Sequence, residues 1–97
     1  MTHSDLEKIQ AYIKQSEPKI DQLRPAESRR LGSAYVTLAL SQADSGRLDL
    51  ALSTIEGALG LLPECTELID TLAEIHARYA TLYKEVAKRQ RTSQRPL

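Results

Sequence analysis

The sequence predicts an all-α protein of about four helices in one small domain. Apolar residues recur at intervals of three and four through most of the 97 residues, which is the spacing of one face of a helix. Strand-type alternation is almost absent, and Pro18, Pro25, Gly46 and Pro63 divide the chain into segments of helical length. Because the chain has no Trp or Phe and only four Tyr, we expect a core built from Leu, Ile, Val and Ala.

Residues 1–24 are expected to form an N-terminal helical segment. Ser4 and Glu7 have the spacing of a capping box, in which each side chain accepts a hydrogen bond from a free backbone amide at the start of a helix. Pro18 is expected to end or kink this helix near Ser16, because proline has no amide hydrogen to donate. The apolar positions of the segment are Leu6, Ile9, Tyr12, Ile13, Ile20 and Leu23.

Two helices are expected to follow as an antiparallel hairpin. Pro25 suits the first turn of a helix over about 26–44, where its missing amide hydrogen costs nothing. Gly46 is expected to cap that helix in the left-handed conformation, and the next helix runs over about 48–62 until Pro63 ends it. The apolar positions are Leu31, Tyr35, Leu38, Ala39 and Ala43, then Leu48, Ala51, Leu52, Ile55, Ala58, Leu59 and Leu62.

A long fourth helix is expected over residues 66–90, from about Thr66 to Lys88 or beyond. The remaining residues, 91–97, lack an apolar face and are expected to be frayed. The fourth helix has a broad apolar face, formed by Leu68, Ile69, Leu72, Ala73, Ile75, Tyr79, Leu82, Tyr83 and Val86.

Residues 26–65 resemble a tetratricopeptide repeat (TPR), which is an antiparallel helix pair of about 34 residues. The positions that match the family's pattern are Tyr35, Leu38, Ala39, Gly46, Ala51, Ile55, Ala58 and Pro63, within about residues 32–65. Gln42 departs from it, because the family places a tyrosine there. An unrelated small helical bundle is the alternative, since any helical hairpin carries Leu and Ala at such spacings.

The same resemblance predicts the beginning of a second repeat. Ile69 and Leu72 follow Tyr35 and Leu38 by one repeat length, and Ala80 stands where the turn glycine of the family is usual. The resemblance therefore implies about one and a half repeats: a TPR-like hairpin, an N-terminal helix and a long C-terminal capping helix. Stacked repeats need about three units for stability, so we expect a second copy, a partner subunit or the N-terminal helix to cover the ends.

In TPR proteins the first helix of each pair lines a groove that binds a partner. The resemblance places Ser33, Val36, Thr37, Leu40, Asp44, Glu67, Asp70, Glu74 and Arg78 in this groove. Val36 and Leu40 stand where the family's carboxylate clamp has Lys and Asn, so we do not expect recognition of a C-terminal carboxylate. An apolar wall beside acidic residues favours an amphipathic helix with a basic edge. The alternatives are a plain solvated helix face and a groove filled by the chain's own N-terminal helix.

The charges of the chain cancel, but they are unevenly distributed. Residues 35–75 hold seven acidic residues and one basic residue, whereas residues 76–97 hold six basic residues and one acidic residue. Zero net charge argues against general nucleic-acid binding, although the basic end leaves a nucleic-acid-binding regulator as a minor alternative. No run of apolar residues is long enough for a signal peptide or a membrane span, so we expect a cytoplasmic protein.

Nothing in the sequence predicts an enzyme, a cofactor or a metal site. His76 has no ligand-type residue three or four positions away, and His3 is the only other histidine. Cys65 is the only cysteine and is expected to be a small residue in a turn between helices. The sequence thus favours a non-catalytic adaptor or small chaperone that binds a helical or extended peptide, as a homo-oligomer or heteromeric subunit. The alternative is a structural homo-oligomerisation module.

Overall fold

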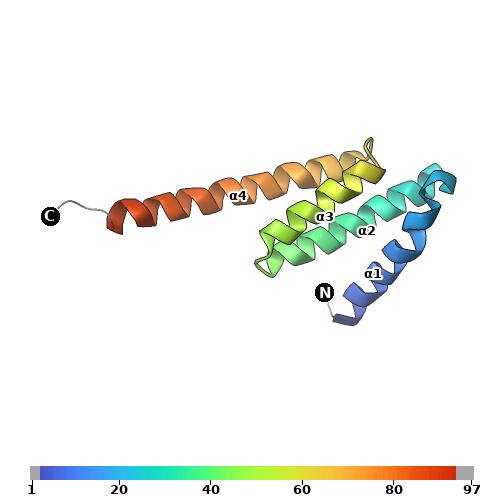
Figure 1. The fold of residues 1–97 in the computed structure, drawn as a ribbon, viewed down its shortest axis with the longest axis horizontal. Coiled ribbons are helices and arrows are strands. Elements are labelled where there is room, and N and C mark those ends of the chain that lie inside the picture. The colour runs from blue at the N-terminus through green and yellow to red at the C-terminus, as the bar shows by residue number, and fades with distance from the viewer. Residues whose placement is uncertain (1–2, 94–97) are drawn as a thin grey trace.

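The computed structural model describes residues 3–93 and confirms the prediction of an all-α fold for them. The elements are α1 (His3–Ser16), the 3-10 segment η1 (Glu17–Gln22), α2 (Pro25–Asp44), α3 (Leu48–Leu61) and α4 (Thr66–Ser93). Helices α2 and α3 form the predicted antiparallel hairpin, α1 packs on α2, and α4 packs on both helices of the hairpin (Figure 1). The molecule is elongated, with extents of 65 × 29 × 16 Å.

Two prolines set the boundaries between the first elements, as predicted. Pro18 lies at the start of η1, directly after α1 ends at Ser16, and Lys19 has non-helical dihedral angles (φ −105°, ψ 15°) that mark the bend. Pro25 opens α2, and the backbone amide of Arg24 donates a hydrogen bond to the Glu27 carboxylate at 3.3 Å. The chain therefore reverses direction between α1 and α2 at the expected place.

Gly46 caps α2 in the predicted left-handed conformation, with a φ of 84°. Its amide donates to the carbonyl of Ala43 at 3.0 Å, and the amide of Arg47 donates to the carbonyl of Gln42 at 2.9 Å. These two bonds form a Schellman motif, which satisfies carbonyls that the helix end leaves free. The tight turn positions α3 antiparallel to α2.

Other boundary predictions need correction. Helix α1 already includes His3, so Ser4 lies inside the helix and is not its N-cap; the predicted capping box is wrong. Glu7 pairs instead with His3, with its Oε1 2.9 Å from the imidazole Nε2. Helix α4 continues to Ser93, past the expected end near residue 90, because basic residues in its last turns favour a helix C-terminus. The rest of the predicted frayed tail, residues 94–97, lies outside the described residues.

The core lies where α2, α3 and the first half of α4 meet. Its largest fully buried side chains are Leu31, Ile55, Leu68 and Ile75. Between them lie the equally buried alanines Ala39, Ala51 and Ala58, whose small side chains let the helix axes approach closely. The predicted aliphatic character of the core is therefore what the structure has.

The turn between α3 and α4 is held close to α2 by a glycine that the sequence reasoning did not single out. A Cβ atom built on Gly32 would lie 2.6 Å from the Sγ atom of Cys65. Cys65 is a half-buried residue just before α4, so its thiol occupies the space that a side chain at position 32 would need. Close approach, and not reactivity, accounts for this Gly–Cys pair.

Tyr35 links η1 to the core. Its ring is 5% exposed, and its hydroxyl donates a hydrogen bond to the Glu17 carboxylate. Burial raises the pKa of the Tyr35 hydroxyl well above its usual range, and the neighbouring Glu17 carboxylate raises that pKa further. Both causes favour the neutral phenol in the folded protein.

The raised pKa of Tyr35 predicts a loss of stability at high pH. In the unfolded chain the phenol ionises near its usual pKa of about 10, whereas in the folded protein it stays neutral to a higher pH. The stability that the folded state gains from this difference is complete below about pH 10 and falls above it by up to about 1.4 kcal/mol per pH unit. Chemical denaturation between pH 8 and 11.5 tests this expectation. We expect Tyr35→Phe to have a flatter profile than the native protein, whereas the control Tyr12→Phe, which keeps the ring that contacts Arg30, should match it. Parallel profiles for the native protein and Tyr35→Phe would contradict the assignment.

The Gly32–Cys65 contact predicts unequal effects for two Gly→Ala changes. Gly57 lies inside α3 and a Cβ there would meet nothing within 4 Å, so Gly57→Ala should stabilise the protein by about 1 kcal/mol through helix propensity. Gly32→Ala must displace the Cys65 thiol and should fall clearly short of that gain. Urea denaturation measures the change in the free energy of unfolding for both variants. Equal gains would show that the Cys65 thiol moves aside at no energetic cost.

Candidate protein-binding surface

Helices α2 and α4 lie side by side and run in the same direction. The Ser33 hydroxyl donates to the Glu67 carboxylate at 2.7 Å, and the Arg78 guanidinium donates to the Asp44 carboxylate at 3.0 Å. Each bond joins residues 34 positions apart, and the two bonds are eleven residues apart on both helices. The two helices are therefore aligned over three turns with no change of register between them.

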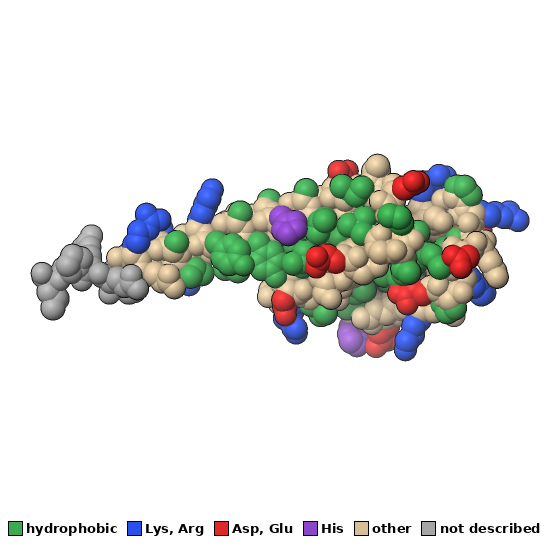
Figure 2. All heavy atoms as spheres, turned by 45° about the horizontal axis from the view of Figure 1, so that its top comes forward, with side chains coloured by type: hydrophobic (Ala, Val, Ile, Leu, Met, Phe, Trp, Pro, Cys, Tyr) green, Lys and Arg blue, Asp and Glu red, His purple; other side chains and the backbone are tan. Residues whose placement is uncertain are grey.

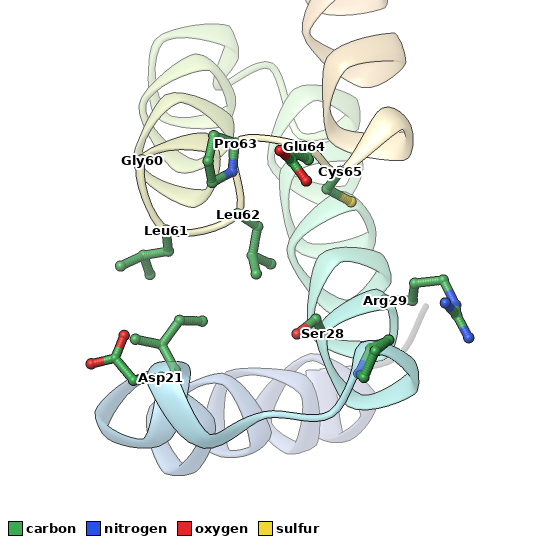
Figure 3. Close-up of a pocket in the computed structure, with 11 residues that line it drawn as sticks. Asp21, Ser28, Arg29, Gly60, Leu61, Leu62, Pro63, Glu64 and Cys65 are labelled. Atoms are coloured by element: carbon green, nitrogen blue, oxygen red, sulfur yellow. The ribbon is translucent and has the colours of Figure 1, made fainter.

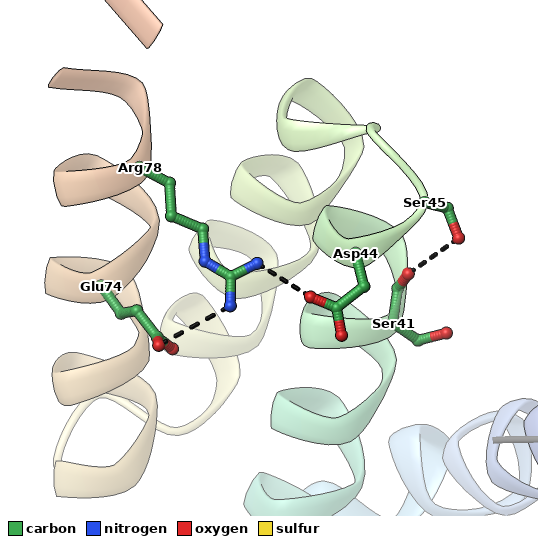
Figure 4. A network of polar contacts seen from close by, with 5 residues as sticks. All are labelled: Ser41, Asp44, Ser45, Glu74 and Arg78. Atoms are coloured by element: carbon green, nitrogen blue, oxygen red, sulfur yellow. Dashed lines mark hydrogen bonds and ion pairs between the residues drawn. The ribbon is translucent and has the colours of Figure 1, made fainter. Parts of the chain in front are cut away.

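The second of these bonds belongs to a small charged cluster (Figure 4). Arg78 also lies 3.7 Å from Glu74 on its own helix, and the Ser45 hydroxyl donates to the carbonyl of Ser41 at 3.0 Å nearby. In this view α3 lies behind α2 and α4, so the cluster is on the side of the two helices that faces away from α3. We call this side, from Ser33 and Glu67 to Asp44 and Arg78, the α2–α4 face.

The charged side chains of the face are open to solvent. The side chains of Asp44, Glu74 and Arg78 are 70%, 51% and 35% exposed. Ion pairs of this kind contribute about 0–1 kcal/mol because water screens them and the side chains lose freedom. The cluster is therefore able to exchange its internal pairs for those of a partner at little energetic cost.

The surface is hollowed along α2 next to these charges. One hollow of about 480 Å³ is lined by Thr37, Leu40, Ser41, Asp44 and Ser45. A second, of about 310 Å³, is lined by Lys8, Ile9 and Tyr12 of α1 together with Arg30, Ser33, Ala34 and Thr37 of α2. Since Thr37 lines both, the hollows adjoin, and together they follow α2 for most of its length.

Helix α1 borders the first part of this surface and does not fill all of it. The Arg30 guanidinium carbon lies 5.2 Å from the centre of the Tyr12 ring, which joins α1 to α2 by a cation–π contact. The residues of α1 line only the hollow nearest the start of α2. No residue of α1 lines the hollow that contains Leu40 and Asp44. The expectation that the N-terminal helix covers the chain's own groove thus applies to one part only.

The nine residues predicted to line a groove differ in their surroundings. Val36 is 8% exposed and belongs to the core, so it is not available to a partner. Ser33, Thr37 and Leu40 are half-buried along α2, and the Thr37 hydroxyl donates to the carbonyl of Ser33 at 3.0 Å. On α4, Glu67, Asp70 and Glu74 are exposed and Arg78 is half-buried. Asp44 completes the set at the end of α2.

Several residues of the hollowed surface were missed by the sequence reasoning. Ser41 and Ser45 carry no motif, and they became visible only through the turn that ends α2. Tyr12 was expected on the apolar face of the N-terminal helix, yet its contact with Arg30 depends on how α1 crosses α2, which spacing alone does not give.

Another hollow lies at the end of the bundle where η1 faces the α3–α4 turn (Figure 3). It measures about 590 Å³, and the side chains that border it include Asp21 and Arg29 as well as Leu61 and Leu62. Glu64 and Cys65 also contribute to its wall, side by side in the α3–α4 turn.

Two further findings concern the described residues only. Within residues 3–93, no three His, Cys, Asp or Glu side chains come together in a way that would hold a metal ion. Over the same range, no helix combines the length and the apolar character that crossing a bilayer requires.

Comparisons of the chain with protein-family models, with curated proteins and with solved structures find no match. The function of the α2–α4 face is therefore argued from its residues.

The exposure of the Asp44–Arg78 pair predicts a weak and salt-dependent coupling. A double-mutant cycle with Asp44→Asn and Arg78→Gln should give an interaction energy of about 0.2–1 kcal/mol by urea denaturation in low salt, and less in 1 M NaCl. A coupling of several kcal/mol would show that the pair holds α2 and α4 together, which its exposure argues against.

Proposed function

We propose that the protein is a non-catalytic protein-interaction module that binds a helical or extended peptide of a partner on the α2–α4 face. The observation that carries this proposal is the pair of bonds Ser33–Glu67 and Asp44–Arg78, each spanning 34 residues. They mark two parallel helices that lie next to each other, and the adjoining hollows follow α2 beside the charged residues of α4. A helix pair repeated after about 34 residues is the arrangement that the resemblance to TPR proteins implies.

The chemistry of the face favours a partner with basic and apolar residues. Glu67, Asp70, Glu74 and Asp44 provide four carboxylates around it, against Arg78 on the face and Lys8 and Arg30 at the hollow nearest the start of α2. Leu40 and Thr37 supply a partly apolar floor in the adjoining hollows. From Ser33 to Asp44 the face is about 17 Å long, which matches about three turns of a bound helix. We therefore propose an amphipathic helix with a basic edge as the preferred ligand, in the manner of an adaptor or a small chaperone.

A display selection tests this proposal. A library of random 16-residue peptides is selected on the immobilised protein, and the affinities of the enriched peptides are measured by fluorescence anisotropy. We expect enriched sequences to carry apolar residues three and four apart with Lys or Arg beside them. Enrichment without such a pattern, or with acidic sequences, would contradict the proposed ligand class.

Three variants decide whether the enriched peptides bind on the α2–α4 face. Asp70→Lys reverses an exposed charge and Leu40→Glu places a charge in the hollow, and each should weaken binding by about tenfold or more. The control Glu56→Lys makes the same charge reversal on an exposed position of α3, on the other side of the hairpin, and should leave affinity within about twofold. Equal losses for Asp70→Lys and Glu56→Lys would show nonspecific attraction to negative charge.

A further inference from the structure

Among the described residues, no apolar side chain of α4 beyond Tyr79 packs against the core. From Tyr79 the helix continues to Ser93, about 21 Å further at 1.5 Å per residue. Figure 1 shows this part extending past the turn between α2 and α3. It carries three large apolar side chains in water: Leu82, Tyr83 and Val86 are 46%, 66% and 40% exposed.

Two of these side chains belong to a stripe that follows α4 along both of its halves. Its positions alternate at intervals of three and four, as in the seam of a coiled coil. The outer stripe consists of Ile69, Leu72, His76, Tyr79, Tyr83 and Val86. Leu72 and Tyr79 are half-buried where the stripe borders the body, whereas Ile69, at 47%, and His76 are exposed.

The outer stripe has open surface on its solvent side. The neighbouring positions Ala73 and Ala80 are small and exposed, so no large side chain blocks the approach of another helix. In the middle of the stripe, the rings of Tyr79 and Tyr83 stack with their centres 6.0 Å apart. Figure 2 shows apolar side chains continuing from the body onto the projecting part of α4. An apolar seam of this length, exposed over half its course, is a surface for another helix.

The charges of α4 indicate which helix fits it. Residues 66–77 contain three acidic residues and no Lys or Arg, namely Glu67, Asp70 and Glu74. Residues 80–91 contain four basic residues and one acidic residue, Glu85. A helix that runs antiparallel to α4 must itself be acidic at its start and basic further along to complement both halves. A second copy of α4 has this distribution, whereas a uniformly charged partner attracts one half and repels the other.

The same antiparallel arrangement aligns the outer stripes of two copies. When Ile69 of one copy lies opposite Val86 of the other, Leu72 lies opposite Tyr83, and His76 lies opposite Tyr79. Each of these three pairs joins a residue from the first half of one α4 to a residue from the second half of the other. The same three pairs occur on both sides of a two-fold axis near the middle of the helix. In this register Glu67 is level with Lys88 of the other copy. A parallel arrangement would place the two basic halves side by side.

We propose that the protein forms a homodimer in which two α4 helices pack antiparallel through the outer stripe. The projecting half of each α4 then lies along the first half of the other α4. This contact covers Ile69 of the first half and Tyr83 of the projecting half. The apolar seam uses different residues from the α2–α4 face, although both proposals use the carboxylates Glu67, Asp70 and Glu74. Neither proposal requires the other.

Sedimentation equilibrium from micromolar to millimolar protein tests the dimer. Tyr83→Glu and Val86→Glu each place a charge in the seam, outside the core, and should raise the dimer dissociation constant by at least about tenfold. The control Thr81→Glu introduces the same charge at an exposed position of α4 away from the stripe and should leave a dimer. Circular dichroism confirms that each variant is folded. A monomer at all concentrations overturns the proposal, and so does a dimer that both seam variants leave unchanged.

Disulfide cross-linking tests the direction of the helices. In a Cys65→Ser background, the double variant Ile69→Cys with Val86→Cys should form a covalent dimer on oxidation, because the two positions face each other across the seam. Ile69→Cys alone should not, since the two copies of position 69 lie about 25 Å apart along antiparallel helices. Efficient cross-linking of the single variant overturns the antiparallel arrangement.

Two other occupants are tested with the same protein. Vesicles of phosphatidylcholine with 30% phosphatidylserine and a 20-base-pair DNA probe the basic half of α4 in 150 mM salt. We expect neither to bind the native dimer. Tight binding to either that Tyr83→Glu removes would assign the outer stripe to that ligand, and would overturn the second copy as its occupant.

Discussion

All the other helices of the described chain pack on α2, and this is possible because α2 combines large and small residues on its buried surface. Leu31 and Tyr35 fill the space between helices, whereas Gly32 and Ala39 bring neighbouring backbones close. Where one helix has small buried residues, large side chains of the neighbouring helices must fill the space between them. Ile55 of α3 and Leu68 of α4 are fully buried side chains of this size. The positions of α1 and α3 therefore depend on the surface of α2, whereas α2 and α3 together position α4.

The register of the α2–α4 face depends on this packing and not on the polar bonds that mark it. Full burial of Leu68 and Ile75 contributes about 1.5–3 kcal/mol each, whereas the exposed Asp44–Arg78 pair contributes about 1 kcal/mol at most. Apolar contacts thus fix how far α4 is shifted along α2, and residues 34 positions apart become neighbours as a result. Because the polar groups are not needed for the fold, their interactions are available for binding.

The helices and the core were predictable because they depend on local spacing. Pro25, Gly46 and Pro63 act on the backbone at their own positions, and buried residues such as Ile55 and Ala58 repeat with the period of a helix. The capping box at Ser4 failed because two residues with a suitable spacing do not decide where a helix begins. The Gly32–Cys65 contact and the position of α1 beside Arg30 depend on how helices cross, which a single sequence does not encode locally. For the same reason the resemblance to TPR proteins implied a groove position for Val36, whereas packing places it in the core.

The long α4 explains how so short a chain can combine a core with a binding surface. A helix that ended at Tyr79 would complete the same core, so the residues beyond it cost backbone entropy without adding buried contacts within the chain. Pairing with a second α4 would supply those contacts. No described residue of α4 lines the hollows along α2, so a dimer through the outer stripe would leave these hollows open on both α2–α4 faces. Two such faces on one particle would hold a partner with two binding segments more tightly than either face alone, because the second segment binds at a high effective concentration.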